Sequence, residues 1–220
     1  MSKRRAAFLT LGCKVNQYET DAMEEILEKA GYEIVSFKET ADVYIINTCS
    51  VTNMADRKSR QMIHRAKKNN PDAIIVAAGC YVQAAEEELA KKNEADILVG
   101  NNKKKDLIAI LDEHFAKIEE KEPQVELIDI AHTHEYEEMR VSRQAEHTRA
   151  NVKVQDGCNQ FCSYCIIPYA RGRVRSRRPE DVVAETGELV KNGFQEIVLT
   201  GIHLSSYGVE LDCTLLDLIR

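Results

Sequence analysis

The sequence predicts an α/β protein in which a parallel-sheet domain is followed by the beginning of a (β/α) partial barrel. Three observations support this fold class. Short apolar runs alternate with segments of helical periodicity over the first 118 residues, the pattern then breaks, and a strand–loop–helix–strand order resumes near residue 149. Strands that alternate with helices favour a parallel sheet covered on both faces.

The first 118 residues contain five apolar runs of strand length, several of which end at a glycine. In chain order we predict strands at Ala6–Leu11, Tyr32–Val35, Val43–Asn47, Ala73–Ala78 and Asp96–Gly100. Between them, apolar residues at helical spacing predict helices over residues 18–30, 54–68, 83–92 and from Leu107 to Phe115. The second of these helices is rich in basic residues, and the third is rich in glutamate.

The domain boundaries follow from the loss of periodicity. We assign residues 1–118 to the N-terminal α/β domain and residues 119–148 to a linker with one short strand, Val125–Ile130. Residues 149–220 form the second unit, with strands at Ala150–Val154 and Glu196–Thr200 and a helix over residues 179–192. This unit holds about two β/α repeats, whereas a closed barrel takes about 250 residues.

Composition and the N-terminal sequence exclude several classes of protein. The chain is 44% hydrophobic and 30% charged, with only 4 Pro and 10 Gly among 220 residues, which excludes collagen-like and largely disordered chains. No run of 18 apolar residues and no secretory signal occurs, so we expect a cytoplasmic protein without a membrane partner. Seven cysteines in a reducing compartment favour metal ligation or catalysis over disulfides.

Positive charge gathers in one part of this acidic chain. The net charge is −6, yet residues 140–179 hold nine Lys or Arg against two acidic residues. Such an island can bind a phosphate backbone, and the alternatives are a solvated charged face or arginines paired with acidic neighbours. The candidate RNA-binding residues are Arg171, Arg173, Arg175, Arg177 and Arg178.

Three cysteines lie within eight residues directly after a predicted strand. Cys158, Cys162 and Cys165 have the spacing C-x3-C-x2-C, and no fourth ligand at zinc-site spacing lies close by. Three thiolates on one cubane cluster leave one iron free for a substrate or cofactor. We interpret the loop as an S-adenosylmethionine-binding cluster site. Tyr164 is expected near the adenine of that cofactor, with plain core packing as the alternative.

Three further cysteines follow three separate strands. Cys13, Cys49 and Cys80 each come close after the C-terminal end of a predicted strand. These ends share one edge of a parallel sheet, where ligands collect, so the sequence predicts a second three-cysteine metal cluster. The alternative is that each buried cysteine acts as a small hydrophobic residue. Cys213 fits neither set, and we expect it to be an unligated thiol.

Four segments together resemble the methylthiotransferase family of radical S-adenosylmethionine enzymes; they are Thr10–Glu19, Asn47–Val51, Ala78–Cys80 and Gly157–Gly172. The resemblance covers the whole chain. It implies an N-terminal α/β domain, a radical-SAM partial barrel and a small RNA-binding β-barrel. It also implies two [4Fe–4S] clusters, with Cys158, Cys162 and Cys165 on the one that cleaves S-adenosylmethionine and Cys13, Cys49 and Cys80 on an auxiliary cluster that handles sulfur.

The implied reaction replaces a C–H bond with a methylthio group, and it requires an electron donor and a source of sulfur. Two segments, Gly12–Gln17 and Leu199–Gly208, look most like the branch that acts on N6-threonylcarbamoyladenosine at tRNA position 37, beside the anticodon. The alternatives are the branches for isopentenyladenosine and for a ribosomal protein, or a non-catalytic iron–sulfur or RNA-binding module. Gly201 is expected beside the cofactor. Most of the barrel and the RNA-binding barrel would lie outside these 220 residues, so a fragment without turnover is a further expectation.

Overall fold

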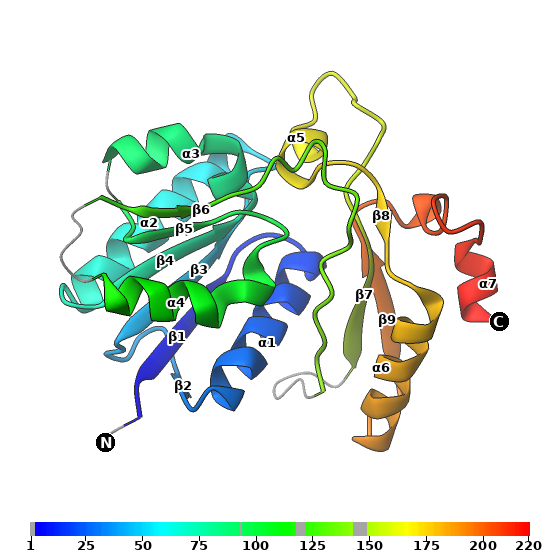
Figure 1. Ribbon diagram of the computed structural model, residues 1–220, viewed down its shortest axis with the longest axis horizontal. Helices are drawn as coiled ribbons and strands as arrows, with labels where there is room; N and C mark the ends of the chain where they lie inside the picture. The colour runs from blue at the N-terminus through cyan, green and yellow to red at the C-terminus, as the bar shows by residue number, and fades with distance from the viewer. Residues whose placement is uncertain (1–2, 93, 118–121, 143–148) are drawn as a thin grey trace.

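The structure is a computed structural model, and it describes residues 3–92, 94–117, 122–142 and 149–220. It contains two β-sheets, which lie side by side with one helix between them (Figure 1). Within the described residues, no helix is both long enough and apolar enough to cross a membrane.

The first sheet has six parallel strands in the order β2-β1-β3-β4-β5-β6. The central strands are continuous apolar runs because both faces of the sheet are covered. Their bounds are β1 (Arg5–Thr10), β2 (Glu33–Val35), β3 (Val43–Thr48), β4 (Ile74–Gly79), β5 (Ile97–Val99) and β6 (Gln124–Glu126).

Helices cover both faces of this sheet. Helices α1 (Lys14–Lys29) and α4 (Leu107–Ala116), the latter preceded by the 3₁₀ turn Lys104–Asp106, pack on one face. Helices α2 (Asn53–Asn69) and α3 (Cys80–Lys92) pack on the other. The Thr52 side chain accepts a hydrogen bond from the Ala55 backbone N–H and so fixes the start of α2. The doubly covered parallel sheet is the predicted fold.

Part of the stretch expected as a linker instead completes the first domain. Residues 124–126 form β6, which pairs in parallel with β5 at the sheet edge. Farther along, Met139 and Val141 are buried in the core beneath α1 and α4. A segment with few apolar residues, such as β6, can still be part of the folded domain, because pairing with β5 supplies its backbone hydrogen bonds.

The second unit is a three-stranded sheet in the order β8-β7-β9. Strands β7 (Ala150–Asp156) and β9 (Ile197–Gly201) are parallel, as predicted, and the short β8 (Arg175–Ser176) runs antiparallel to β7. Helix α6 (Pro179–Lys191) covers this sheet. Two short helices that the sequence pattern did not predict are α5 (Ile167–Arg171) and α7 (Leu215–Ile219).

Helix α1 joins the two units. It packs on the first sheet and also contacts β7 and β9. Tyr18 on this helix is buried, and its hydroxyl donates to the Met139 backbone carbonyl and lies 3.0 Å from Glu185 Oε1 on α6. Burial raises the pKa of the Tyr18 hydroxyl well above its usual value, so it stays a donor at neutral pH.

Candidate functional site

Cys13, Cys49 and Cys80 lie at one edge of the first sheet. Cys13 directly precedes α1, Cys49 follows β3 directly, and Cys80 is the first residue of α3, directly after β4. Their strands β1, β3 and β4 are adjacent and parallel, so their carboxyl ends meet at this edge. The structure therefore brings these three thiols together in the way that the strand pattern predicted.

Tight turns bring the strand ends close to one another. Gly12 has φ +104°, and a Cβ atom at this position would stand 2.9 Å from the Cys49 sulfur. Gly79 has φ +95°, and a Cβ there would stand 2.6 Å from Asn47 Oδ1. Only glycine takes such backbone angles without strain and leaves this space open. Burial raises the pKa of the Cys49 thiol, and the nearby Cys80 and Cys13 sulfurs raise it further.

Buried amide and guanidinium groups surround these sulfurs. The Cys13 thiol donates to Asn16 Oδ1 at 3.5 Å, while the Asn16 amide donates to the Leu11 and Thr48 carbonyls. On the other side, Arg171 Nε lies 3.2 Å from the Cys80 sulfur. Asn101 Nδ2 approaches the same sulfur at 3.7 Å. Three thiols at one sheet edge, one of them with two N–H donors aimed at its sulfur, form a donor set that suits an iron–sulfur cluster.

No group of three His, Cys, Asp or Glu side chains in the part of the chain that the structure describes is drawn tightly enough to hold one metal ion. A cubane cluster makes a different demand, because each thiolate binds a different iron atom and the sulfurs stand farther apart than ligands of a single ion.

The second cysteine set lies on the loop between β7 and α5, which projects beyond α5 in Figure 1. Cys158 is buried, Cys165 is half-buried and Cys162 is exposed. The backbone N–H of Cys158 donates to the Gly172 carbonyl, and that of Cys165 donates to the Cys162 carbonyl. These bonds hold the loop at its base and in its last turn, and they leave its tip open to a ligand.

The two residues expected beside the cofactor have different surroundings. Tyr164 has 90% of its surface exposed, so it does not pack in the core and its ring is free to meet a ligand. Gly201 ends β9, and a Cβ there would stand 3.0 Å from the Gln155 side chain. Both lie at carboxyl ends of the second sheet's parallel strands, because the Tyr164 loop follows β7.

The arginine island divides into exposed and buried members. Arg173 and Arg178 are exposed, whereas Arg171, Arg175 and Arg177 are no more than 1% exposed. The expectation that these three side chains bind RNA is wrong for this structure, because they are enclosed and paired with carboxylates. This is the alternative of arginines paired with acidic neighbours. Arg177, for example, contacts Glu185 and Glu138.

A buried charge network that the sequence analysis missed joins the two units. Glu19 on α1 accepts hydrogen bonds from Lys104 at 2.5 Å, Lys153 at 2.7 Å and Arg171 at 2.7 Å. Asp156 pairs with Lys153 at 2.7 Å and with Arg171 at 3.1 Å. All five side chains are nearly or fully buried. Charges this deep remain ionised only because each has partners.

The electrostatic consequences follow from burial and pairing together. Burial opposes ionisation of Glu19, but the charges of Arg171, Lys104 and Lys153 outweigh it and hold the pKa of Glu19 well below its usual range. Burial also opposes ionisation of Asp156, and Arg171 and Lys153 hold its pKa below the usual range as well. The pKa of Lys153 is raised, because Asp156 and Glu19 outweigh its burial.

One sequence signal could have revealed this network. Glu19 falls on the same helical face as Ala22, Met23 and Ile26, which predicts burial of a carboxylate. Likewise Lys153 interrupts the apolar strand Ala150–Val154. A charged residue at an apolar position predicts a buried ion pair, although it does not name the partner.

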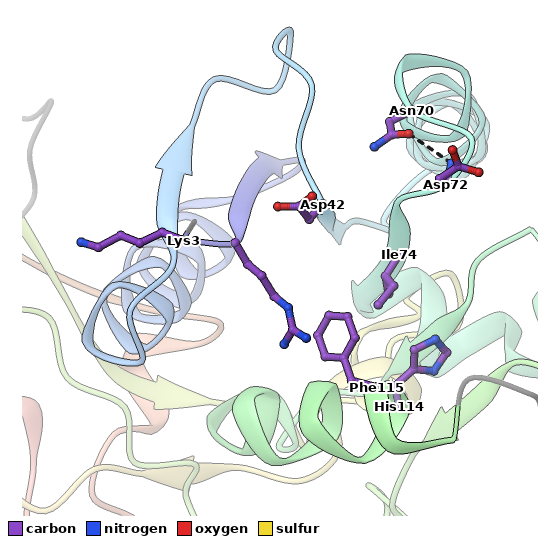
Figure 2. A pocket seen from close by; sticks show the side chains of 8 residues that line it. Lys3, Asp42, Asn70, Asp72, Ile74, His114 and Phe115 are labelled. Carbon is purple, nitrogen blue, oxygen red and sulfur yellow. Dashed lines mark hydrogen bonds between the residues drawn. The ribbon is translucent and has the colours of Figure 1, made fainter. Parts of the chain in front are cut away.

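A cavity of about 590 Å³ lies at the opposite edge of the first sheet, near the amino ends of β1 and β4. Figure 2 shows its lining, in which Asn70 and Asp72 are joined by a hydrogen bond and Phe115 stands beside Ile74. The Arg4 guanidinium stacks 3.7 Å from the centre of the Phe115 ring. The cavity is remote from the cysteines because parallel strands place their two ends at opposite edges.

Two family descriptions match separate parts of the chain. Residues 5–100 match the family described as "Uncharacterized protein family UPF0004", and residues 152–212 match the "Radical SAM superfamily". The first range contains five of the six strands of the first sheet, the second range contains most of the second sheet, and each range includes one cysteine set.

Curated relatives are similar to nearly the whole chain. Threonylcarbamoyladenosine tRNA methylthiotransferase MtaB of Bacillus subtilis is 47% identical over 93% of this chain and 45% of the relative. The protein of the same name from Aquifex aeolicus is 48% identical over 93% of this chain and 49% of the relative. A tRNA-2-methylthio-N(6)-dimethylallyladenosine synthase of Moorella thermoacetica is 38% identical over 96% of this chain and 48% of the relative. The chain spans about half the length of these relatives.

A solved structure shares the fold. The radical S-adenosylmethionine methyltransferase TsrM of Kitasatospora setae, with cobalamin and a [4Fe–4S] cluster bound, matches with a TM-score of 0.61 and 14% identity, over 96% of this chain and 49% of the other. That likeness concerns the fold alone. With two matching domains, two cysteine sets and close relatives along its length, the chain belongs to the radical S-adenosylmethionine methylthiotransferase family.

Proposed function

We propose that the protein containing this chain inserts a methylthio group at C2 of N6-threonylcarbamoyladenosine 37 in tRNA, in the cytoplasm. The observation that carries the proposal is the 47–48% identity to two proteins named for this activity, over 93% of the chain. The relative named for the dimethylallyladenosine reaction is less similar, at 38% identity. This difference favours the threonylcarbamoyl substrate.

The two cysteine sets suit two [4Fe–4S] clusters with different roles. Cys158, Cys162 and Cys165 would hold the cluster that binds S-adenosylmethionine, and Cys13, Cys49 and Cys80 would hold the auxiliary cluster. When bound, the two clusters and S-adenosylmethionine supply the electron, the methyl group and the sulfur that the reaction needs. The chain's own part is to hold the thiolates and to give the cofactor an open face. The exposed Tyr164 ring and Gly201 at the end of β9 would border that face.

A basic surface that starts near the auxiliary site and runs along α2 away from it suits the anticodon arm of tRNA. Helix α2 begins four residues after Cys49, and Ser59 on this helix accepts a hydrogen bond from the Cys49 backbone N–H at 3.4 Å. The helix buries Ser59, Ile63 and Ala66 and exposes basic residues around the rest of its circumference. We call these exposed residues the α2 basic face; they are Arg57, Lys58, Arg65, Lys67 and Lys68.

The α2 basic face stands out because the chain as a whole carries a net charge of −6. Such a face attracts the phosphate backbone, and the exposed Arg173 and Arg178 of the arginine island add to the same positive field. Because the buried arginines are enclosed and do not reach RNA, we propose that α2 makes much of the contact with it.

The test is mass spectrometry of tRNA nucleosides from cells that lack the full-length gene. We expect the methylthio group to be lost from threonylcarbamoyladenosine while methylthio-isopentenyladenosine is unchanged. The full-length gene should restore it, the Cys162→Ala variant should not, and the matched Cys213→Ala variant should. Loss of the methylthio group from isopentenyladenosine alone would overturn the proposed substrate, and no change in either nucleoside would overturn the proposed activity.

A further inference from the structure

Arg171 connects the two cysteine sets. It ends α5, six residues after Cys165, and so belongs to the second unit. Its side chain nevertheless reaches the first domain, where Nε lies 3.2 Å from the Cys80 sulfur and Nη2 lies 2.7 Å from Asn16 Oδ1. Helix α5 packs against α3, which begins at Cys80. The loop of one set is thereby tied to a sulfur of the other.

The Arg171 side chain is held rigidly. It is 0% exposed, and its guanidinium binds two carboxylates, Glu19 and Asp156, at distances of 2.7 to 3.2 Å. With these acceptors and Asn16 occupying the Nη atoms, the Nε–H is directed at the Cys80 sulfur. A guanidinium has a fixed planar arrangement of donors, so this direction follows from the other contacts.

The charges around Arg171 leave a positive excess next to the sulfur. The ion-paired network contains two carboxylates, Glu19 and Asp156, and four cations. The cations are Lys104, Lys153, Arg171 and Arg175. If the buried Glu137 is also counted as ionised, one positive charge still remains without a negative partner. A buried excess charge is costly unless an anion lies near it. A thiolate at Cys80, as in a cluster ligand, supplies that anion.

We infer that Arg171 is a positioning residue that donates a hydrogen bond to the Cys80 ligand sulfur of the auxiliary cluster and thereby raises the reduction potential of that cluster. The inference rests on the auxiliary-cluster assignment in the proposed function. A hydrogen bond to a ligand sulfur and a nearby positive charge both stabilise the more negative, reduced cluster, which makes reduction easier. The same contact fixes the auxiliary site relative to the loop that holds the other cluster.

The experiment is a redox titration followed by electron paramagnetic resonance. The full-length protein carries Cys158→Ala, Cys162→Ala and Cys165→Ala, so that only the auxiliary cluster is present. Into this parent we introduce Arg171→Met, which removes both the donor and the charge. We also introduce Arg171→Lys. Lysine keeps the positive charge beside Glu19 and Asp156, but its single ammonium group replaces the separate Nε–H that arginine directs at the Cys80 sulfur. The matched control is Arg173→Met, an exposed arginine on the same segment.

We expect the midpoint potential to shift to more negative values in Arg171→Lys and further in Arg171→Met, and to stay unchanged in Arg173→Met. A purely structural role would change cluster content without moving the potential of the clusters that form. If Arg171→Met fails to assemble a cluster, Arg171→Lys decides the matter. An intact cluster with the parent's potential in Arg171→Lys and in any assembled Arg171→Met would overturn the inference. Absence of any cluster from the parent would instead overturn the auxiliary-cluster assignment.

Discussion

Replacing Glu19 with glutamine removes the carboxylate on which the buried charge network depends. Three cations lie within 2.7 Å of its oxygens, and none of them is more than 1% exposed. In Glu19→Gln, Asp156 is the one carboxylate left among the ion-paired residues of the network, against the four cations Lys104, Lys153, Arg171 and Arg175. Breaking a buried ion pair by removing one partner costs about 3–5 kcal/mol. For a chain of 220 residues, each kcal/mol lowers Tm by about 2–4 °C, so we expect a loss of about 6–20 °C.

The assay is thermal unfolding followed by circular dichroism, with urea unfolding as a second measurement. The control is Glu33→Gln at the sheet edge, whose side chain is 58% exposed and lies 3.8 Å from Arg5. Surface pairs contribute about 0–1 kcal/mol, so this variant should unfold close to the parent. If Glu19→Gln unfolds within about 1 kcal/mol of the parent, Glu19 does not hold the network together and the reasoning is refuted.

Three further predictions concern acid stability, a loop glycine and RNA binding. The native pKa values of Glu19 and Asp156 lie below their usual range, so the unfolded chain binds more protons in acid than the folded chain does. The free energy of unfolding should therefore fall progressively as the pH drops below about 4.5. Urea unfolding measures it, and a free energy that stays constant down to about pH 2 would contradict this. Gly157→Ala should destabilise the protein by more than about 1 kcal/mol, because the added Cβ would stand 1.8 Å from a backbone carbonyl oxygen at φ +72°. The matched Gly187→Ala in α6, which meets no atom within 4 Å, should stabilise it by about 0.5–1 kcal/mol, and equal effects would refute the argument. Reversing three charges of the α2 basic face, in Arg57→Glu, Arg65→Glu and Lys68→Glu together, should weaken binding of an anticodon stem-loop. The slope of the logarithm of the binding constant against the logarithm of salt concentration should fall in magnitude by about 2 to 3. The same reversal at three scattered exposed lysines, in Lys38→Glu, Lys105→Glu and Lys191→Glu together, should change neither quantity.

The first sheet could be predicted from the sequence because its elements depend on local pattern. Continuous apolar runs such as Val43–Asn47 have no helical periodicity, and they become buried parallel strands. The meeting of Cys13, Cys49 and Cys80 could also be predicted, since it needs only that three parallel strands end at one edge. The order and direction of the strands are sufficient for that prediction.

The role of the arginine island could not be predicted in the same way. Charge counted along residues 171–178 does not tell which side chains are enclosed, because their partners come from distant parts of the sequence. Arg171 pairs with Glu19, 152 positions away, and Arg177 pairs with Glu185 on the following helix. Arg175, Ser176 and Arg177 are all buried at and directly after β8, whereas Arg173 and Arg178 lie on either side of them and stay exposed.

The central claim is that six cysteines form two separate cluster sites, and iron content measures it most directly. The full-length protein, reconstituted anaerobically, should bind about eight iron atoms, and variants that break one set should bind about four. We predict that Cys49→Ala and Cys162→Ala each lose half of the iron, that their combination loses all of it, and that Cys213→Ala loses none. A full-length protein with only about four iron atoms, all of them lost in Cys162→Ala and none in Cys49→Ala, would contradict the account.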